Sequence, residues 1–155
     1  GETSHESLCR FRRLHTDYLN AKYAVVLTGI NDLVIASMMN EGRKETVSSV
    51  LDNIGEIIHI ALSRKLKVIV ISPPPPISPD ILRKFLWGEG INESSFWLND
   101  EITKRFKGEV CVIDFQAVFI DPTKAILRRD LSRDALHWNS KGYRELNDAL
   151  LASCI

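Results

Sequence analysis

The sequence predicts an α/β protein in which a parallel sheet lies between layers of helices. Three short apolar runs, rich in β-branched residues, occur at 23–29 (YAVVLTG), 66–72 (LKVIVIS) and 109–115 (EVCVIDF). Each run is continuously apolar, which is typical of strands buried on both faces of a parallel sheet. Helical patterns separate the runs, and this alternation favours βαβ units. We therefore expect a three-layer α/β domain.

The helices follow from the spacing of apolar residues. One is expected before the first strand, over 8–19 (LCRFRRLHTDYL). Two shorter helices are expected over 81–86 and 96–106, and a last one over 141–153, where Asn139 or Ser140 can cap the N-terminus. Between the first two strands, apolar residues recur at steps of three and four, as on one face of an amphipathic helix. These residues are Val47, Val50, Leu51, Ile54, Ile57, Ile58, Ala61 and Leu62.

Composition excludes several classes of protein. The 155 residues suit one domain, and 45% hydrophobic with 26% charged residues is ordinary for a globular fold. Twenty basic residues balance twenty acidic ones, so no basic excess indicates a nucleic-acid partner. No apolar run has the length of a membrane span. Cys9, Cys111 and Cys154 are odd in number and widely spaced, so we expect neither a disulfide framework nor a metal motif, and Cys111 should be a buried strand residue.

Polar residues that could take part in binding or catalysis follow the expected strands or precede the last helix. Gly29-Ile30-Asn31-Asp32 comes after the first strand, and Ser72 with four prolines after the second. In parallel sheets, ligands bind beyond the carboxyl ends of the strands. The stretch DALHWNSKGY places Asp134 three residues before His137. A histidine is a general base near neutral pH, and an acid beside it can fix its tautomer.

Together, VVLTGINDL and DALHWNSKGY resemble the SGNH (GDSL-type) hydrolase family. In that family a Gly-x-Asn-Asp block follows a central strand, which matches Gly29, Asn31 and Asp32 here. An Asp-x-x-His block precedes the last helix, which matches Asp134 and His137. The family often has proline after the histidine, where this chain has a tryptophan.

The N-terminal stretch extends the resemblance over essentially the whole chain. GETSHESLCRFRRLHTDYL is similar to the family's second block, whose glycine is then Gly1. The resemblance implies a flavodoxin-like three-layer sheet and a carboxylic ester hydrolase with a Ser-His-Asp triad that needs no cofactor or metal. It implies His137 as the base and Asp134 as its orienting acid. The Asn31 amide and the N–H of Gly1 would bind the oxyanion, with Gly29 in the same site.

The nucleophile of that family is absent from the sequence. It belongs to a Gly-Asp-Ser block upstream of the second block, and neither Gly-Asp-Ser nor Gly-x-Ser-x-Gly occurs here. We therefore expect residues 1–155 to be one SGNH-type domain that is incomplete at its N-terminus. The strand at 23–29 would then be an open edge for a missing N-terminal segment or a second chain. Thr3 or Ser4 in GETS, and Ser72, are disfavoured substitutes.

Three functions remain open from the sequence. The first is an esterase, lipase or acetylesterase acting on a small-molecule, carbohydrate or lipid ester. The second is an O-acyltransferase of the same family, in which an alcohol replaces water. The third is a non-catalytic pseudoenzyme or binding fragment. Residues 1–155 alone are expected to be inactive as a serine esterase, and the sequence assigns no compartment.

Overall fold

The computed structural model describes residues 1–14, 20–74, 90–121, 126–133 and 137–155. The expected helix over 81–86 and the candidate acid Asp134 lie outside these ranges. No helix in the described part of the chain is both long and apolar enough to cross a membrane.

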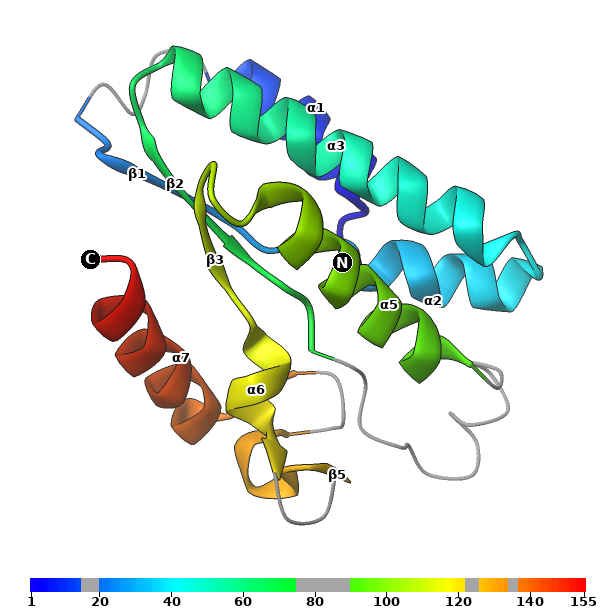
Figure 1. The fold of residues 1–155 in the computed structure, drawn as a ribbon. Coiled ribbons are helices and arrows are strands. Elements are labelled where there is room, and N and C mark those ends of the chain that lie inside the picture. Colours follow the sequence, from blue (N-terminus) through cyan, green and yellow to red (C-terminus); the bar gives the residue numbers. More distant parts are fainter. Residues whose placement is uncertain (15–19, 75–89, 122–125, 134–136) are drawn as a thin grey trace.

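A three-stranded parallel sheet forms the centre of the fold, as the sequence predicts (Figure 1). Its strands are β1 (Tyr23–Val26), β2 (Lys67–Ile71) and β3 (Cys111–Ile113), in the order β1-β2-β3. Val25 lies opposite Ile69 in the register of the first pair, and Val70 opposite Val112 in that of the second. Because all strands are parallel, their carboxyl ends meet at one edge of the sheet, and this edge carries the candidate site.

Helices α2 (Ile30–Met39), α3 (Arg43–Ser63) and α5 (Ile91–Phe106) pack on one face of the sheet, and α1 (Ser4–Arg13) packs on α3. The amphipathic stripe expected between the first two strands is the buried face of α3. It meets alternate residues of the strands in one apolar core. The strand residues in this core are Ala24, Val26, Val68 and Val70.

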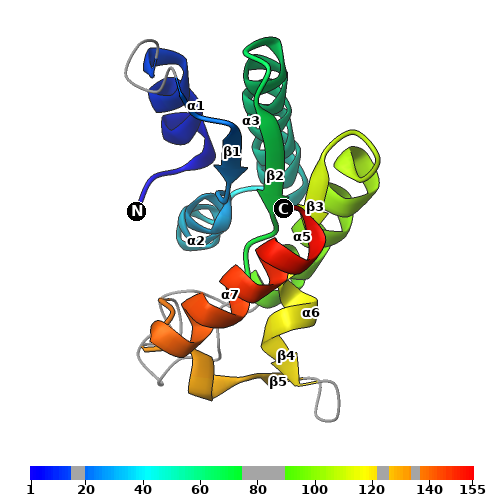
Figure 2. The ribbon, with the colours of Figure 1, turned by 90° about the vertical axis from the view of Figure 1, so that its left-hand side faces the viewer.

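The opposite face of the sheet carries a second core under α6 (Phe115–Phe119) and α7 (Ser140–Ser153) (Figure 2). Asn139 caps α7 by accepting hydrogen bonds from the N–H groups of Lys141 and Gly142, as predicted. Between the two helices lie β4 (Ile120–Asp121), β5 (Ile126–Leu127) and the short helix η1 (Arg129–Leu131). Helices on both faces confirm the three-layer α/β fold.

The structure corrects three helix predictions. Helix α5, expected over 96–106, begins earlier, at Ile91. Helix α2 was not expected, because its residues INDLVIASMM show no clear apolar stripe. Its burial comes from Leu33 and Ala36, which face α3 and α5. Helix α1 begins at Ser4 rather than at 8, because Thr3 and Glu6 form a capping box. This Thr-x-x-Glu pattern in the sequence is the signal that predicts the earlier start.

Burial on both faces, expected for every strand, is wrong for β1. The side chains of Val25 and Leu27 are 53% and 41% exposed, whereas Ile69, the register partner of Val25, is 1% exposed. Helix α7 packs on β3 and thus covers only part of the sheet. Strand β1 also ends at Val26, three residues earlier than the sequence predicts.

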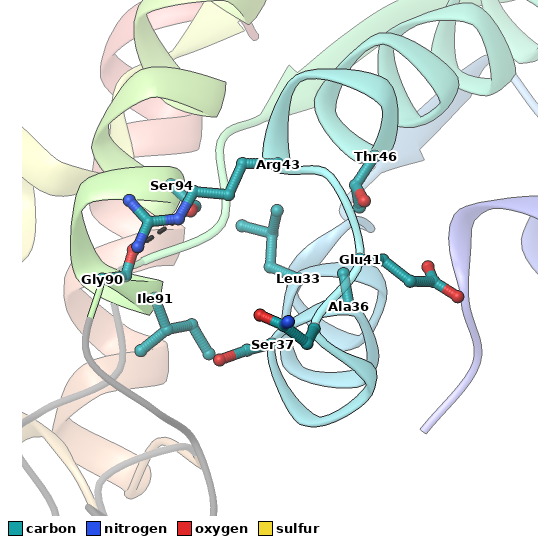
Figure 3. Close-up of a pocket in the computed structure, with 10 residues that line it drawn as sticks. Leu33, Ala36, Ser37, Glu41, Arg43, Thr46, Gly90, Ile91 and Ser94 are labelled. Atoms are coloured by element: carbon teal, nitrogen blue, oxygen red, sulfur yellow. Dashed lines mark hydrogen bonds between the residues drawn. The ribbon is translucent and has the colours of Figure 1, made fainter.

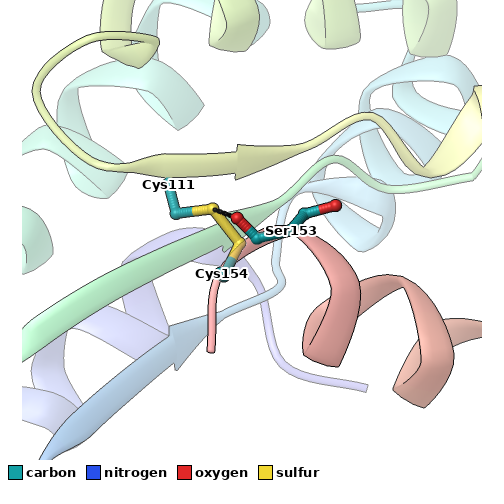
Figure 4. Close-up of a disulfide and its surroundings, with 3 residues drawn as sticks. All are labelled: Cys111, Ser153 and Cys154. Carbon is teal, nitrogen blue, oxygen red and sulfur yellow. Dashed lines mark hydrogen bonds between the residues drawn. A yellow bond between two sulfur atoms is a disulfide. The ribbon is translucent and has the colours of Figure 1, made fainter.

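The cysteine prediction is also wrong, because Cys111 and Cys154 form a disulfide (Figure 4). Cys111 is half-buried at the start of β3, and Cys154 follows the last turn of α7. The Sγ atom of Cys111 also lies 3.6 Å from the carbonyl oxygen of Ser153. The odd number of cysteines and their wide spacing could not reveal this pair, since only packing of α7 on β3 brings the two cysteines together.

Candidate functional site

Gly29 makes the turn from β1 into α2 at the carboxyl edge of the sheet. Its φ of 111° lies in the left-handed region, which favours glycine. A Cβ atom at this position would lie 2.8 Å from the Cγ1 atom of Val50 and 3.0 Å from the Cδ2 atom of Leu98. Both backbone conformation and packing therefore require glycine, and the turn puts Asn31 in the first helical turn.

The Asn31 side chain meets the N-terminal residues of the chain. Its Nδ2 atom donates a hydrogen bond of 2.8 Å to the carbonyl oxygen of Glu2. The same amide group lies so close to Gly1 that a Cβ atom there would collide with Nδ2. A carboxamide has two N–H hydrogens, and the bond to Glu2 fixes the plane of the group while using one of them. Residues 29 apart in the sequence thus form one polar cluster.

Asp32 accepts hydrogen bonds from the same N-terminal segment. Its Oδ2 atom accepts a hydrogen bond from the backbone N–H of Ser4 at 2.8 Å, and its Oδ1 atom accepts one from the Ser4 hydroxyl at 2.6 Å. The Ser4 Oγ atom also accepts a bond of 2.9 Å from the Nδ2 atom of Asn53 in α3. The sequence gives no local signal for the part of Ser4 and Asn53 in this contact, because both residues are far from Asp32 along the chain.

Neither serine considered as a substitute nucleophile is accessible. Ser4 is 0% exposed, and its hydroxyl bonds to Asp32. Ser72, also 0% exposed, donates from Oγ to the carbonyl oxygen of Ile113 at 3.4 Å and accepts from the N–H of Phe115 at 3.0 Å. Thr3 is the N-cap of α1. These three hydroxyls stabilise the local fold.

His137 lies in an exposed loop that hydrogen bonds fix before α7. Its carbonyl oxygen accepts from the N–H of Arg133 at 2.8 Å and from the hydroxyl of Ser132 at 3.0 Å. The Nδ2 atom of Asn139 donates to the carbonyl oxygen of Asp130 at 2.7 Å. Hydrogen bonds therefore hold the His137 carbonyl and the residues that follow it, while its partner in the Asp-x-x-His block, Asp134, lies outside the described residues.

An ion pair between η1 and α7 stabilises the loop that contains His137. The Nζ atom of Lys141, in the first turn of α7, bonds to the carboxylate of Asp130. This hydrogen bond is the main cause that lowers the pKa of Asp130 below its ordinary value, and the charges of Lys141 and Arg128 add to it. The pair ties η1 to the start of α7 around the histidine.

Trp138 belongs to an aromatic cluster under the loop. Its ring centroid lies 4.4 Å from that of Phe115, 5.6 Å from that of Phe119 and 5.4 Å from that of Tyr143. These contacts show that the Trp138 ring packs within the fold. The side chain anchors the residue next to His137 to α6.

The disulfide fixes the direction of α7 along the sheet. Cys154, at the end of α7, is bonded to the first residue of β3, so α7 runs back along the sheet and begins near the carboxyl ends of the strands. Figures 1 and 2 nevertheless both draw the N-terminus and the start of α7 well apart. The structure thus joins Gly1 and Asn31 in one cluster, with Gly29 in the turn before Asn31, and it places His137 in the loop before α7.

Two hollows lie beside α2. One, of about 550 Å³, borders Thr3 and Asp32 and continues between α2 and α3. The other, of about 220 Å³, is lined by residues of α2, α3 and α5 (Figure 3). There the Ser94 hydroxyl donates to the carbonyl oxygen of Gly90 at 3.0 Å. No group of three His, Cys, Asp or Glu side chains suited to a metal ion occurs in the described ranges.

Comparisons with known proteins agree with this architecture. The chain is similar to a GDSL-like lipase from Bacteroides thetaiotaomicron, with a TM-score of 0.74, 21% identity and coverage of 97% of this chain and 70% of that one. A protein from Bacteroides fragilis described as an acylhydrolase has a TM-score of 0.74, 18% identity and coverage of 97% and 69%. A catalytic variant of an acetylxylan esterase from Geobacillus stearothermophilus has a TM-score of 0.74, 13% identity and coverage of 98% and 67%.

At the level of sequence, no family model matches the chain, and no curated protein matches it. The likeness is therefore one of fold. Because the match covers nearly all of this chain but a smaller share of each neighbour, part of each neighbour has no counterpart within residues 1–155. Residues 1–155 thus have the SGNH hydrolase fold seen in GDSL-type lipases, acylhydrolases and esterases.

Proposed function

We propose that residues 1–155 are the larger part of a carboxylic ester hydrolase whose nucleophilic serine comes from outside this sequence. The single observation that carries the proposal is the approach of Gly1 to the Asn31 amide at the carboxyl edge of the sheet. Two hydrogen-bond donors that converge from different elements suit the oxyanion of a tetrahedral intermediate. The esterase and lipase neighbours support an ester as the substrate.

In the proposed reaction, His137 accepts the proton of the external serine as its oxygen attacks the ester carbonyl. The second N–H of the Asn31 amide and the N–H of Gly1 donate to the oxyanion that forms. His137 then passes the proton to the leaving alcohol, and a water molecule, activated in the same way, releases the acid. Asp134 is proposed to orient the imidazole. Gly29 holds the turn that aims Asn31.

The test compares the 155-residue chain with a chain extended upstream through its own reading frame. With a p-nitrophenyl acetate-type ester, we expect no His137-dependent turnover from the first and clear turnover from the second. In the extended chain, His137→Ala should abolish turnover, whereas His59→Ala, an exposed histidine in α3, should not change it. Asn31→Ala should lower kcat by about 10²–10³-fold, as loss of one oxyanion donor does.

Several results would contradict the proposal. Turnover by residues 1–155 that is lost on His137→Ala would show that the nucleophile lies within this sequence. An extended chain that binds esters without cleaving them would favour the pseudoenzyme. Transfer of the acyl group to an added alcohol in preference to water would favour the acyltransferase.

A further inference from the structure

Asn53 is a polar residue beside the apolar stripe of α3. Its Nδ2 atom donates a hydrogen bond of 2.9 Å to the Oγ atom of Ser4, a residue 49 positions earlier in the sequence. Ser4 is 0% exposed, and it begins α1, which packs along α3 (Figure 1). The bond therefore joins the middle of α3 to the N-terminal segment of the candidate site.

The hydrogen-bond network fixes the direction of the Ser4 hydroxyl. Its Oγ atom lies 2.6 Å from the Oδ1 atom of Asp32, and a carboxylate oxygen only accepts hydrogen bonds. The hydroxyl has one hydrogen, so this hydrogen goes to Asp32. The partner on the other side must then be a donor, as the Nδ2 group of Asn53 is. Asparagine satisfies this position, whereas an aspartate would compete with Asp32 for the single hydrogen.

The same part of α3 also supports the turn before Asn31. Val50 lies three residues before Asn53 and so on the same side of the helix. It approaches Gly29 so closely that a Cβ atom there would lie 2.8 Å from its Cγ1 atom. One turn of α3 thus contacts both segments that carry the candidate donors, the turn before Asn31 and the residues after Gly1.

Ser4 in turn holds the residues that contact the Asn31 amide. Its backbone N–H donates to the Oδ2 atom of Asp32 at 2.8 Å, and Asp32 directly follows Asn31. Two residues before Ser4, the carbonyl oxygen of Glu2 accepts the bond of 2.8 Å from the Asn31 Nδ2 atom. The Glu2 side chain also pairs with Arg10, but this ion pair is exposed and contributes little. The segment before α1 is thus placed chiefly through Ser4.

We propose that Asn53 is a positioning residue for the candidate oxyanion donors. Its amide directs the Ser4 hydroxyl to Asp32. That pair then holds Gly1 beside the Asn31 amide. Asn53 acts through these contacts and donates nothing to the oxyanion itself. Only the use of the donors in ester cleavage rests on the function proposed above, whereas the effect of Asn53 on their placement does not.

NMR spectra of the 155-residue chain test the placement. Asn53→Asp removes the donor and puts a second carboxylate beside the Ser4 hydroxyl, so it should shift the side-chain amide resonances of Asn31. Asn53→Ala removes the donor without a competing acceptor and should shift them less. Asn147→Asp, at an exposed asparagine of α7, is the matched control and should leave them unchanged. Unchanged Asn31 resonances in both folded Asn53 variants would overturn the proposal.

An exchange of the two side chains tests the direction of the hydroxyl. The double variant Asn53→Asp with Asp32→Asn moves the carboxylate to α3 and the amide to α2. The Ser4 hydroxyl can then donate to position 53, while the amide at position 32 donates to Oγ and accepts from the Ser4 N–H. We expect the Asn31 resonances to return toward their original positions. Shifts that simply add up from the two single variants would contradict the directional role of Asn53.

Kinetics of the chain extended upstream separate positioning from substrate binding. Asn53→Asp should lower kcat by about tenfold or more with little change in KM, because displaced donors weaken contacts made only in the transition state. The double variant should recover most of this loss, and Asn147→Asp should leave kcat unchanged. A loss confined to KM would overturn the proposal. Shifted Asn31 resonances in an extended chain that cleaves no ester would support the positioning role and contradict the hydrolase.

Discussion

Ser4 and Asp32 are joined by two hydrogen bonds between the start of α1 and the first turn of α2. The backbone N–H of Ser4 donates at 2.8 Å and its hydroxyl at 2.6 Å, one to each carboxylate oxygen. Together with the Asn31–Glu2 hydrogen bond, this contact holds the N-terminal segment against α2. The placement of Gly1 and Asn31 therefore depends on this part-buried pair.

We predict that Ser4→Ala lowers the free energy of unfolding by about 1–3 kcal/mol, since it removes the hydroxyl bond to Asp32 and leaves the Asn53 amide without its acceptor. Urea unfolding followed by circular dichroism measures the change. Ser48→Ala, on the exposed face of α3, is the matched control and should lie within about 0.5 kcal/mol of the unchanged chain. Equal effects of the two variants would show that the Ser4 bonds contribute nothing.

Gly29 and Gly108 allow backbone strain to be separated from crowding. Their φ angles are 111° and 110°, but a Cβ atom at Gly29 meets Val50 at 2.8 Å, whereas at Gly108 it meets nothing within 4 Å. Gly108→Ala should cost about 1–2 kcal/mol of stability, the cost of a left-handed alanine. Gly29→Ala should cost more, by about 1–3 kcal/mol, because the core must also move. Chemical denaturation of both variants checks the difference, and equal costs would contradict it.

The disulfide between Cys111 and Cys154 should stabilise the fold by roughly 2–4 kcal/mol, since it closes a loop with a sequence separation of 43 residues. Cys154→Ser should lower the thermal midpoint and remove the response of that midpoint to dithiothreitol. Cys9→Ser, at the free cysteine, is the control and should leave both unchanged. Titration of the unreduced, denatured chain should find one thiol, and three thiols would show that the bond does not form.

Lys141→Met should raise the pKa of Asp130 toward its ordinary value, because the hydrogen bond from Lys141 is the main cause of its lowered pKa. A lowered folded-state pKa contributes stability above the ordinary aspartate pKa and loses it as the pH falls through the lowered one. The stability difference between the two chains should therefore be present at neutral pH and vanish in acid. An NMR titration of the Asp130 carboxyl measures the shift, with Lys44→Met as control. An unchanged titration would contradict the pairing.

The sequence by itself determined the parallel α/β architecture, because continuous β-branched runs and the stripe on α3 are local patterns typical of strands and of an amphipathic helix. It also identified the Asn31 and His137 blocks, whose spacing is local. Contacts between distant residues were decided only by tertiary packing. Examples are the Ser4–Asp32 pair, 28 residues apart, and the Cys111–Cys154 bond.

The same distinction applies to β1. Its apolar run predicts a strand with both faces buried, since local sequence reports the preference of the chain and not the presence of a neighbour. Only the three-dimensional sheet shows that Val25 faces outward and that, among the described residues, β1 pairs with β2 alone. Hydrophobic burial depends on what packs against a side chain. The sequence could therefore identify the strand, and only the tertiary structure could show which of its faces is exposed.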